Sequence, residues 1–199
     1  MTFKKRSKAV EVYQIKVTLE GIQPPIWRRV QLGRDTTLAK FHMVLQRAMG
    51  WTNSHLHQFV IRGQYFAPRD VFSEIGGPKM ESETKATLSD VVSGARSRLR
   101  YEYDMGDSWL HAIVVEKVLN AEAGAQYPVC LAGARACPPE DCGGIGGYEE
   151  LLGAVADPQH ERHEELLEWL GGSFDPEKFD LNAVNAGLKA LHRARAARA

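Results

Sequence analysis

Imidazole, carboxylate and thiol side chains gather in three short segments of the 199-residue chain. Imidazoles and carboxylates exchange protons in aqueous solution, and together with thiolates they are common ligands of transition metals. If the three segments meet in the folded chain, they predict one pocket suited to acid–base or metal chemistry. The predicted pocket residues are His55, His57, Asp104, Asp107, His111, Cys137, Glu140, Asp141 and Cys142.

The spacing of two cysteines raises a metal hypothesis. Cys137 and Cys142 form a C-x4-C pair, at the loose end of the spacing that zinc sites use. Two thiolates and two imidazoles would make a tetrahedral Zn set, for which His57 and His111 are the candidate imidazoles. The same spacing is also compatible with two small buried side chains in a loop shaped by Gly and Pro.

An enzyme is the alternative reading of these residues. A Cys/His pair could supply a nucleophile and its base, and an Asp/His pair could supply an acid and a base. The chain contains no nucleophile elbow, HExxH zinc helix or dinucleotide fingerprint. The glycines of 143–147 lack the Lys-Ser/Thr of a phosphate-binding loop, so turn formation explains them better. The histidines can equally be buried, hydrogen-bonded side chains.

The elements that position these residues follow from hydrophobic periodicity. Alternating apolar and polar residues predict five strands, at 10–19, 26–32, 56–62, 98–103 and 109–118. Apolar residues at helical spacing predict a helix over 38–49, with Thr36 or Thr37 as its cap and Gly50 as its stop. We also expect a helical turn from Thr87, and helices over 148–155, over 157–170 and after Asp175.

Five strands followed by helices predict an α+β fold. We expect a mixed, mainly antiparallel sheet of about five strands on one helix, similar to a β-grasp, with a C-terminal helical segment. Residues 63–85 and 119–147 are expected to be loops. We expect one domain over 10–192, with its sheet part at about 10–118, its cysteine loop at 119–147 and its helical part at 148–192. Basic tails are expected at 1–9, which we take as disordered, and at 193–199.

Charge is unevenly distributed although the formal net charge is zero. Residues 137–180 hold twelve acids against two cations, whereas the two tails hold seven cations and no acid. The tails, with Arg28 and Arg29, could contact nucleic acid. Solvated chain ends explain the tails as well, and an exposed strand face that pairs with the acidic segment 137–180 explains the two arginines equally. The acidic body opposes a long phosphate-binding surface, so nucleic acid is not the favoured partner.

The sequence also constrains the compartment. No apolar run is long enough to span a bilayer, and no apolar stretch follows the N-terminal cations as it would in a secretory signal. Three cysteines, an odd number, argue against a disulfide framework. These features predict a cytoplasmic protein with no membrane partner.

Four separated segments resemble one known family. In chain order they are IQPPIWRR at 22–29, AMGW with SHLHQF at 48–59, YEYDMGDSW with His111, and CPPEDCGG with Gly147-Tyr148. Together they resemble the plasmid pRiA4b ORF-3-like family over about residues 10–185. Met105 stands where the family usually has an aromatic residue. The resemblance implies a similar order of elements and brings no agreed catalytic residues.

Members of that family occur on plasmids and beside mobile elements. We expect the predicted pocket to belong to a binding or interaction module, and the resemblance implies an association with plasmid or mobile-element biology. A metal-assisted or Cys/His-based enzyme is the first alternative function. A nucleic-acid binder acting through the basic tails and Arg28/Arg29 is the second.

Overall fold

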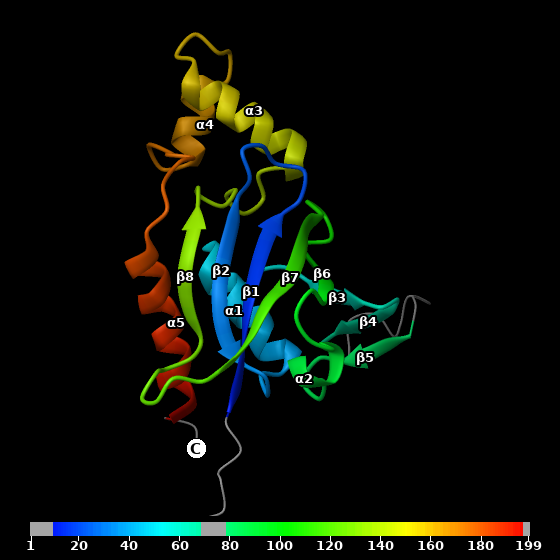
Figure 1. Cartoon of the computed structure of the whole chain (residues 1–199). Coiled ribbons are helices and arrows are strands. Elements are labelled where there is room, and N and C mark those ends of the chain that lie inside the picture. The colour runs from blue at the N-terminus through cyan, green and yellow to red at the C-terminus, as the bar shows by residue number, and fades with distance from the viewer. Residues whose placement is uncertain (1–9, 69–78, 197–199) are drawn as a thin grey trace, which may run out of the picture.

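The computed structural model describes residues 10–68 and 79–196, with side chains up to residue 191. Within these ranges the chain forms one eight-stranded sheet and five helices (Figure 1). The strands are β1 (Glu11–Leu19), β2 (Trp27–Gly33), β3 (His57–Ile61), β4 (Gln64–Ala67), β5 (Met80–Ser82), β6 (Arg98–Tyr103), β7 (Trp109–Asn120) and β8 (Val129–Ala134). The helices are α1 (Leu38–Met49), α2 (Leu88–Val91), α3 (Gly144–Ala156), α4 (His163–Trp169) and α5 (Leu181–Ala196).

The strand order across the sheet is β5-β4-β3-β6-β7-β1-β2-β8. Only β4 and β5 pair in parallel, and every other neighbouring pair is antiparallel. The expected β-grasp-like sheet of about five strands on one helix is therefore wrong. The five expected strands are present as β1, β2, β3, β6 and β7, and β4, β5 and β8 extend the sheet at both edges.

The three additional strands lie in the two segments that were expected to be loops. β4 has four residues and β5 has three, which is too short for an alternating pattern to stand out. β8 has the sequence VCLAGA, whose small residues have weak strand preference. It forms because β2 offers it an open edge, on which Trp27 pairs with Ala134 and Arg28 with Gly133.

The C-terminal helices also differ from expectation. α3 begins at Gly144 rather than at 148, because the loop before it docks on the sheet and fixes its first turn. The helix expected over 157–170 is limited to α4, and the start signal at Asp175-Pro176 precedes α5 by several residues. The basic tails expected at 1–9 and 193–199 have no described side chains.

One face of the sheet buries α1, as Figure 1 shows, and α5 lies along the edge strand β8. Thr37 caps α1 by accepting a hydrogen bond from the Lys40 N–H, and Gly50 ends the helix in the left-handed conformation. Phe41 of the helix stacks on Phe59 of β3, and both rings are fully buried. No helix of the described residues is long and apolar enough to cross a membrane.

Candidate functional site

The site forms where the start of β3 lies beside the end of β6. His57 pairs with Tyr103 across these antiparallel strands, and the Asp104 N–H donates to the Leu56 carbonyl at 2.8 Å. This register places His55, just before β3, next to the β6–β7 turn. Two of the three chemistry-bearing segments therefore meet through strand pairing alone.

The β6–β7 turn fixes Asp104. This residue has a positive φ of 59°, which Asp tolerates better than most residues. Its Oδ1 accepts a hydrogen bond from the Gly106 N–H at 2.9 Å, so the side chain closes the turn. Its Oδ2 lies 3.7 Å from His55 Nε2. One carboxylate oxygen thus serves the turn, and the other is directed to the site.

The loop at 135–143 brings the third segment to the same place. The Trp51 indole N–H donates to the Pro138 carbonyl at 3.1 Å, and Asp107 Oδ2 accepts from the Gly143 N–H at 3.2 Å. Gly144 allows this close approach, and Gly147 allows the loop to pack against the first turns of α3. A Cβ at Gly147 would stand 1.8 Å from the Cys142 carbonyl oxygen, and one at Gly144 would stand 2.8 Å from the Asp107 oxygen. The glycines are therefore packing devices.

Glu140 is held in place by neighbours on two elements. Its Oε1 accepts hydrogen bonds from the Thr52 N–H at 2.8 Å, the Thr52 hydroxyl at 2.9 Å and the Tyr103 hydroxyl at 3.0 Å. Burial, and next the bond to Glu140, raise the pKa of Tyr103 well above its usual range. Tyr103 therefore remains a hydrogen-bond donor at any physiological pH. Oε2 of Glu140 also accepts from the Tyr103 hydroxyl, at 3.2 Å, and lies 3.7 Å from His55 Nε2.

His55 lies among three carboxylates. Its Nε2 is 3.0 Å from Asp141 Oδ1 and 3.7 Å from oxygens of both Asp104 and Glu140. The Asp141 contact lacks hydrogen-bond geometry, so this buried nitrogen has no hydrogen-bond partner among the described residues. Ligand atoms of His55, Asp104 and Asp141 all lie within 4.8 Å of one another. We call these three residues and Glu140 the His55 cluster.

The other two histidines of the predicted pocket lie in the core. His57 Nε2 is 2.8 Å from Glu83 Oε2, and its ring stacks on His42 with centroids 3.4 Å apart. Burial, and next the neighbouring His57, lower the pKa of His42 to about 3. His42 is therefore a neutral ring that bonds the Tyr101 hydroxyl at 2.8 Å and Asn53 at 2.6 Å.

His111 is fully buried in β7. Its Nδ1 lies 3.3 Å from the Tyr101 carbonyl, and its ring meets Trp51 edge-on. Burial lowers its pKa to about 4, so the ring is neutral at physiological pH. Neither His57 nor His111 belongs to the His55 cluster.

The two cysteines of the predicted zinc set flank the His55 cluster without joining it. Both thiols are free, and Cys137 packs against the apolar core together with Cys142. Burial, and next the charge of Asp107, raise the pKa of Cys142 to about 12. Burial raises the pKa of Cys137 still further. Both side chains are therefore thiols at neutral pH.

The two arginines considered for nucleic-acid contact are occupied within the protein. Arg28 is 3% exposed, and its guanidinium donates to backbone carbonyls of Trp27, Ala48, Ala134 and Arg135 at 2.8 Å each. Arg29 donates to both oxygens of Glu116, at 2.6 and 2.8 Å. Arg28 thereby joins β2, β8 and the end of α1.

Of the nine predicted pocket residues, the structure brings His55, Asp104, Glu140 and Asp141 together, with Asp107 and the cysteines around them. It separates His57 and His111 from them. Sequence reasoning missed Thr52 and Tyr103, which hold Glu140 in the site, and Glu83 and His42, which hold His57 in the core. Tyr103 could have been found from the sequence, because it ends a strand immediately before the Asp104 turn. Glu83 could not, because it lies in a segment that was expected to be a loop.

The fold and site define an α+β domain on one eight-stranded mixed sheet, with a histidine–carboxylate cluster at the start of β3. The chain belongs to the family described as plasmid pRiA4b ORF-3-like protein, which it matches over residues 11–183, and the resemblance seen in the sequence is confirmed.

Two relatives support this assignment. The chain is 40% identical over 183 residues to the uncharacterized protein y4hQ of Sinorhizobium fredii, covering 92% of this chain and 90% of that protein. It is similar to the crystal structure of MM3350, a protein of unknown function from Methanosarcina mazei Go1. That match has a TM-score of 0.77 and 38% identity, and it covers 88% of this chain and 98% of the other.

Proposed function

We propose that this protein is a binding module that takes a divalent transition-metal ion in the His55 cluster. The observation that carries the proposal is a shielded imidazole nitrogen, His55 Nε2, with no hydrogen-bond partner and three carboxylates within 3.7 Å. Buried polar atoms are almost always satisfied. His111 Nε2 is also unsatisfied, but no carboxylate of the described residues forms an ion pair with it, so the carboxylates around His55 are what favour an ion there. Carboxylates in such close company also repel one another unless a cation lies between them.

The spacing of the donor atoms supports this proposal. Nitrogen and oxygen ligands lie about 2.1 Å from Zn²⁺, which places neighbouring ligands of a tetrahedral ion about 3.4 Å apart. The separations from His55 Nε2 to Asp141 and Asp104, 3.0 and 3.7 Å, lie on either side of that value. Small side-chain movements would therefore suffice to close the set.

The chemistry of the donor set indicates which ions would bind. One imidazole with carboxylates suits Zn²⁺, Mn²⁺ or Fe²⁺ rather than Ca²⁺ or Cu⁺. Asp104 would be a rigid ligand, because its turn holds it, and Asp141 an adaptable one, because 70% of its side chain is exposed. Binding by His55, Asp104 and Asp141 alone would leave a fourth position for water or for a bound partner.

The rival functions receive less support. A cysteine nucleophile would need a thiolate, whereas both thiols are packed against apolar side chains. A nucleic-acid surface built on Arg28 would need an accessible guanidinium, whereas this one is buried. Because the family is described as plasmid pRiA4b ORF-3-like protein, we also propose a link with mobile-element biology.

Metal titration tests the proposal. The full chain, stripped with a chelator and dialysed, is titrated with Mn²⁺, Zn²⁺ and Co²⁺ by isothermal calorimetry. We expect one site per chain. His55→Ala should abolish binding and Asp141→Asn should weaken it at least tenfold, since each removes one ligand. His160→Ala, on the segment before α4, is the matched control and should bind as the unaltered chain does.

The Co²⁺ spectrum separates the two possible ligand sets. A site of imidazole and carboxylates gives weak visible bands only, whereas cysteine ligation adds an intense thiolate charge-transfer band. Absence of binding, or unchanged affinity in His55→Ala, would reject the proposal. A charge-transfer band lost in Cys137→Ser would replace it with a thiolate site.

A further inference from the structure

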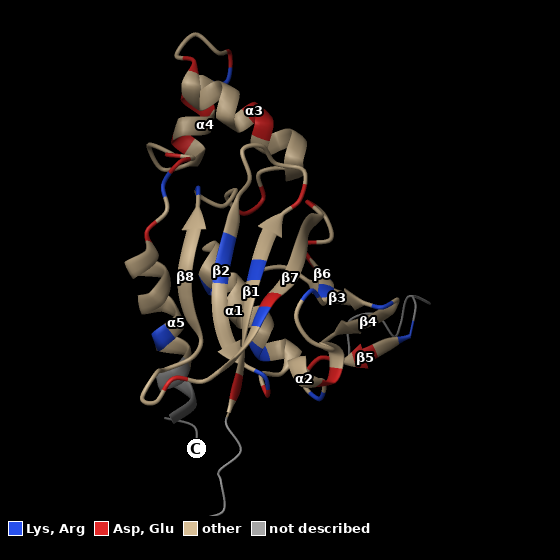
Figure 2. Cartoon of the chain, in the orientation of Figure 1, with Lys and Arg blue, Asp and Glu red and all other residues tan. Residues whose placement is uncertain are grey.

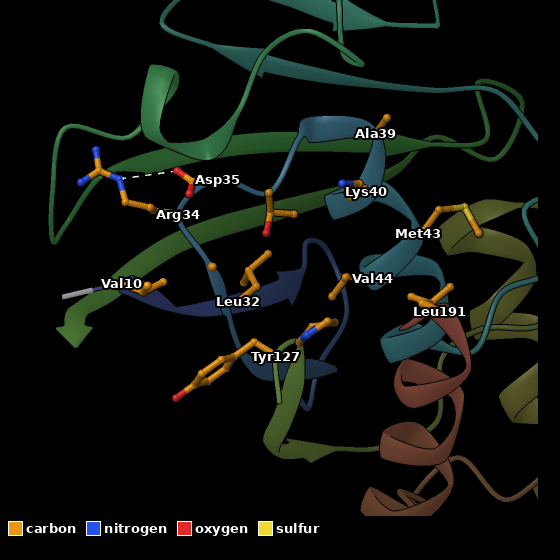
Figure 3. Close-up of a pocket in the computed structure, with 13 residues that line it drawn as sticks. Val10, Leu32, Arg34, Asp35, Ala39, Lys40, Met43, Val44, Tyr127 and Leu191 are labelled. Carbon is orange, nitrogen blue, oxygen red and sulfur yellow. Dashed lines mark ion pairs between the residues drawn. The ribbon is translucent and has the colours of Figure 1, made fainter. Parts of the chain in front are cut away.

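A second concave site lies at the other end of α1 from the His55 cluster. A cavity of about 490 Å³ opens there, which is within the usual range for small-molecule sites. Figure 3 shows that its lining comes from five separate parts of the chain: Val10 before β1, the end of β2 with the residues that follow it, the first turns of α1, the segment before β8, and α5. No residue of the proposed metal site contributes to it.

The lining of this cavity is mainly apolar. Leu32 and Val44 belong to the hydrophobic core and form part of its surface. Met43 and Leu191 extend the apolar lining along the two helices (Figure 3). An apolar surface left open to water favours binding of an apolar molecule, at about 25 cal/mol for each Å² that becomes buried.

The two cations of the lining differ in whether they form ion pairs. Arg34 is ion-paired with Glu11 and lies 4.0 Å from a carboxylate oxygen of Asp35, a contact drawn dashed in Figure 3. Lys40, in the first turns of α1, has no ion pair with any described residue. Thr36 adds a hydroxyl to the same lining. Within the described residues, the cavity therefore offers one cation without an ion pair beside an apolar surface.

We propose that this cavity binds an amphipathic monocarboxylate. The apolar chain or ring of the ligand lies on Leu32, Met43 and Val44, and its carboxylate pairs with Lys40. One cation without an ion pair among the described residues, beside a mainly apolar lining, matches one carboxylate better than a phosphate-rich ligand, which would need several donors. The volume accommodates a medium-chain fatty acid. This site is independent of the metal proposal, because the two share no residue.

Calorimetric titration of the full chain with decanoate tests the inference. We expect one site per chain, weaker binding of decan-1-ol, and no detectable binding of butyrate, whose chain is too short to cover the lining. Lys40→Gln should weaken decanoate binding about fivefold, as loss of one partly exposed ion pair does, and leave decan-1-ol unchanged. Lys117→Gln, at an exposed position of β7, is the matched control and should have no effect.

Charge reversal provides a readout that a misfolded variant cannot imitate. Lys40→Glu should lose decanoate binding and gain binding of decyltrimethylammonium, the cation with the same chain. Ala39→Trp, provided that its circular dichroism and melting match those of the unaltered chain, should block both ligands by filling the cavity. Equal affinity for decanoate and decan-1-ol, no effect of Lys40→Gln, or full binding by a folded Ala39→Trp would each overturn the proposal.

Discussion

A histidine nitrogen shielded from water without a hydrogen bond destabilises a fold, and His55 Nε2 is such an atom. Three carboxylates lie near this nitrogen, but none of them forms a hydrogen bond with it. A metal ion would satisfy the nitrogen and neutralise the carboxylates together. The same residue types elsewhere, as in the pair of His57 with Glu83, satisfy each other and need no ion.

Arg28, in contrast to His55, is a buried side chain whose polar atoms form hydrogen bonds within the protein. Because its guanidinium satisfies four backbone carbonyls, we expect Arg28→Met to lower the free energy of unfolding by about 3 kcal/mol. Urea unfolding at pH 7 measures this.

Arg29→Met is the matched control on the same strand. Its partly exposed pair with Glu116 contributes about 1 kcal/mol or less. Equal effects of the two substitutions would show that Arg28 does not anchor β8 to β2.

At the scale of elements, the start of α3 decides whether the loop at 135–143 reaches the sheet. A Cβ at Gly147 would overlap the Cys142 carbonyl oxygen, so we expect Gly147→Ala to destabilise the fold by about 2 kcal/mol. The same substitution should weaken metal binding at least tenfold, because it displaces Glu140 and Asp141. Thermal melting and metal calorimetry measure the two effects.

Gly146→Ala is the neighbouring control for this prediction. A Cβ at Gly146 meets nothing within 4 Å, and alanine favours a helix over glycine by about 1 kcal/mol. This variant should therefore be as stable as the unaltered chain or slightly more so. If Gly147→Ala behaved in the same way, close docking of the loop would not be what holds the site together.

Strand pairing at the sheet edge explains why β8 forms. β8 reads poorly as a strand, yet it supplies the edge from which the loop at 135–143 crosses to the site. A strand of small residues can form there because backbone hydrogen bonds to β2 do not depend on side chains. Its local preference is overridden by its neighbour.

For the whole molecule, two neutral buried histidines make stability depend on pH. His111 and His42 have pKa values of about 4 and about 3 in the fold, against about 6.5 in an unfolded chain. As pH falls below 6.5 the unfolded state binds more protons than the folded state, so stability decreases toward pH 4. His42 faces the His57–Glu83 pair, Tyr101 and Asn53, whereas His111 faces Trp51 and Tyr101.

Urea unfolding at pH 7 and pH 5 measures this loss. His111→Phe removes one of the two groups and should reduce the difference between the two pH values by about 2 kcal/mol. His160→Ala, near the surface, should leave the difference unchanged. A His111→Phe variant with the full pH dependence would show that His111 is protonated in the fold.

The distribution of charge also belongs to the scale of the whole molecule. Acidic side chains gather on α3, on α4 and in the neighbouring loops, at the end of the sheet that carries the His55 cluster (Figure 2). This surplus of negative charge favours the approach of a metal cation and opposes the approach of a polyanion.

The sequence alone determined the strands β1, β2, β3, β6 and β7, α1 with both of its ends, and the family of the protein. These features are encoded locally: alternation defines β1 and β7, and Thr37 and Gly50 define the ends of α1. The tight turn at Asp104 was equally readable, because Asp and Gly provide the backbone conformations that such turns need.

Only the tertiary structure decided which chemical groups meet. His55 and His57 lie two residues apart and were both expected in one pocket, yet one joins Asp104 and Asp141 whereas the other pairs with Glu83. The difference arises because β3 begins at His57, so that His55 precedes the strand and escapes its alternation. Strand ends, edge pairing by β4, β5 and β8, and the packing of Gly144 on Asp107 depend on contacts between distant residues, and no local pattern encodes such contacts.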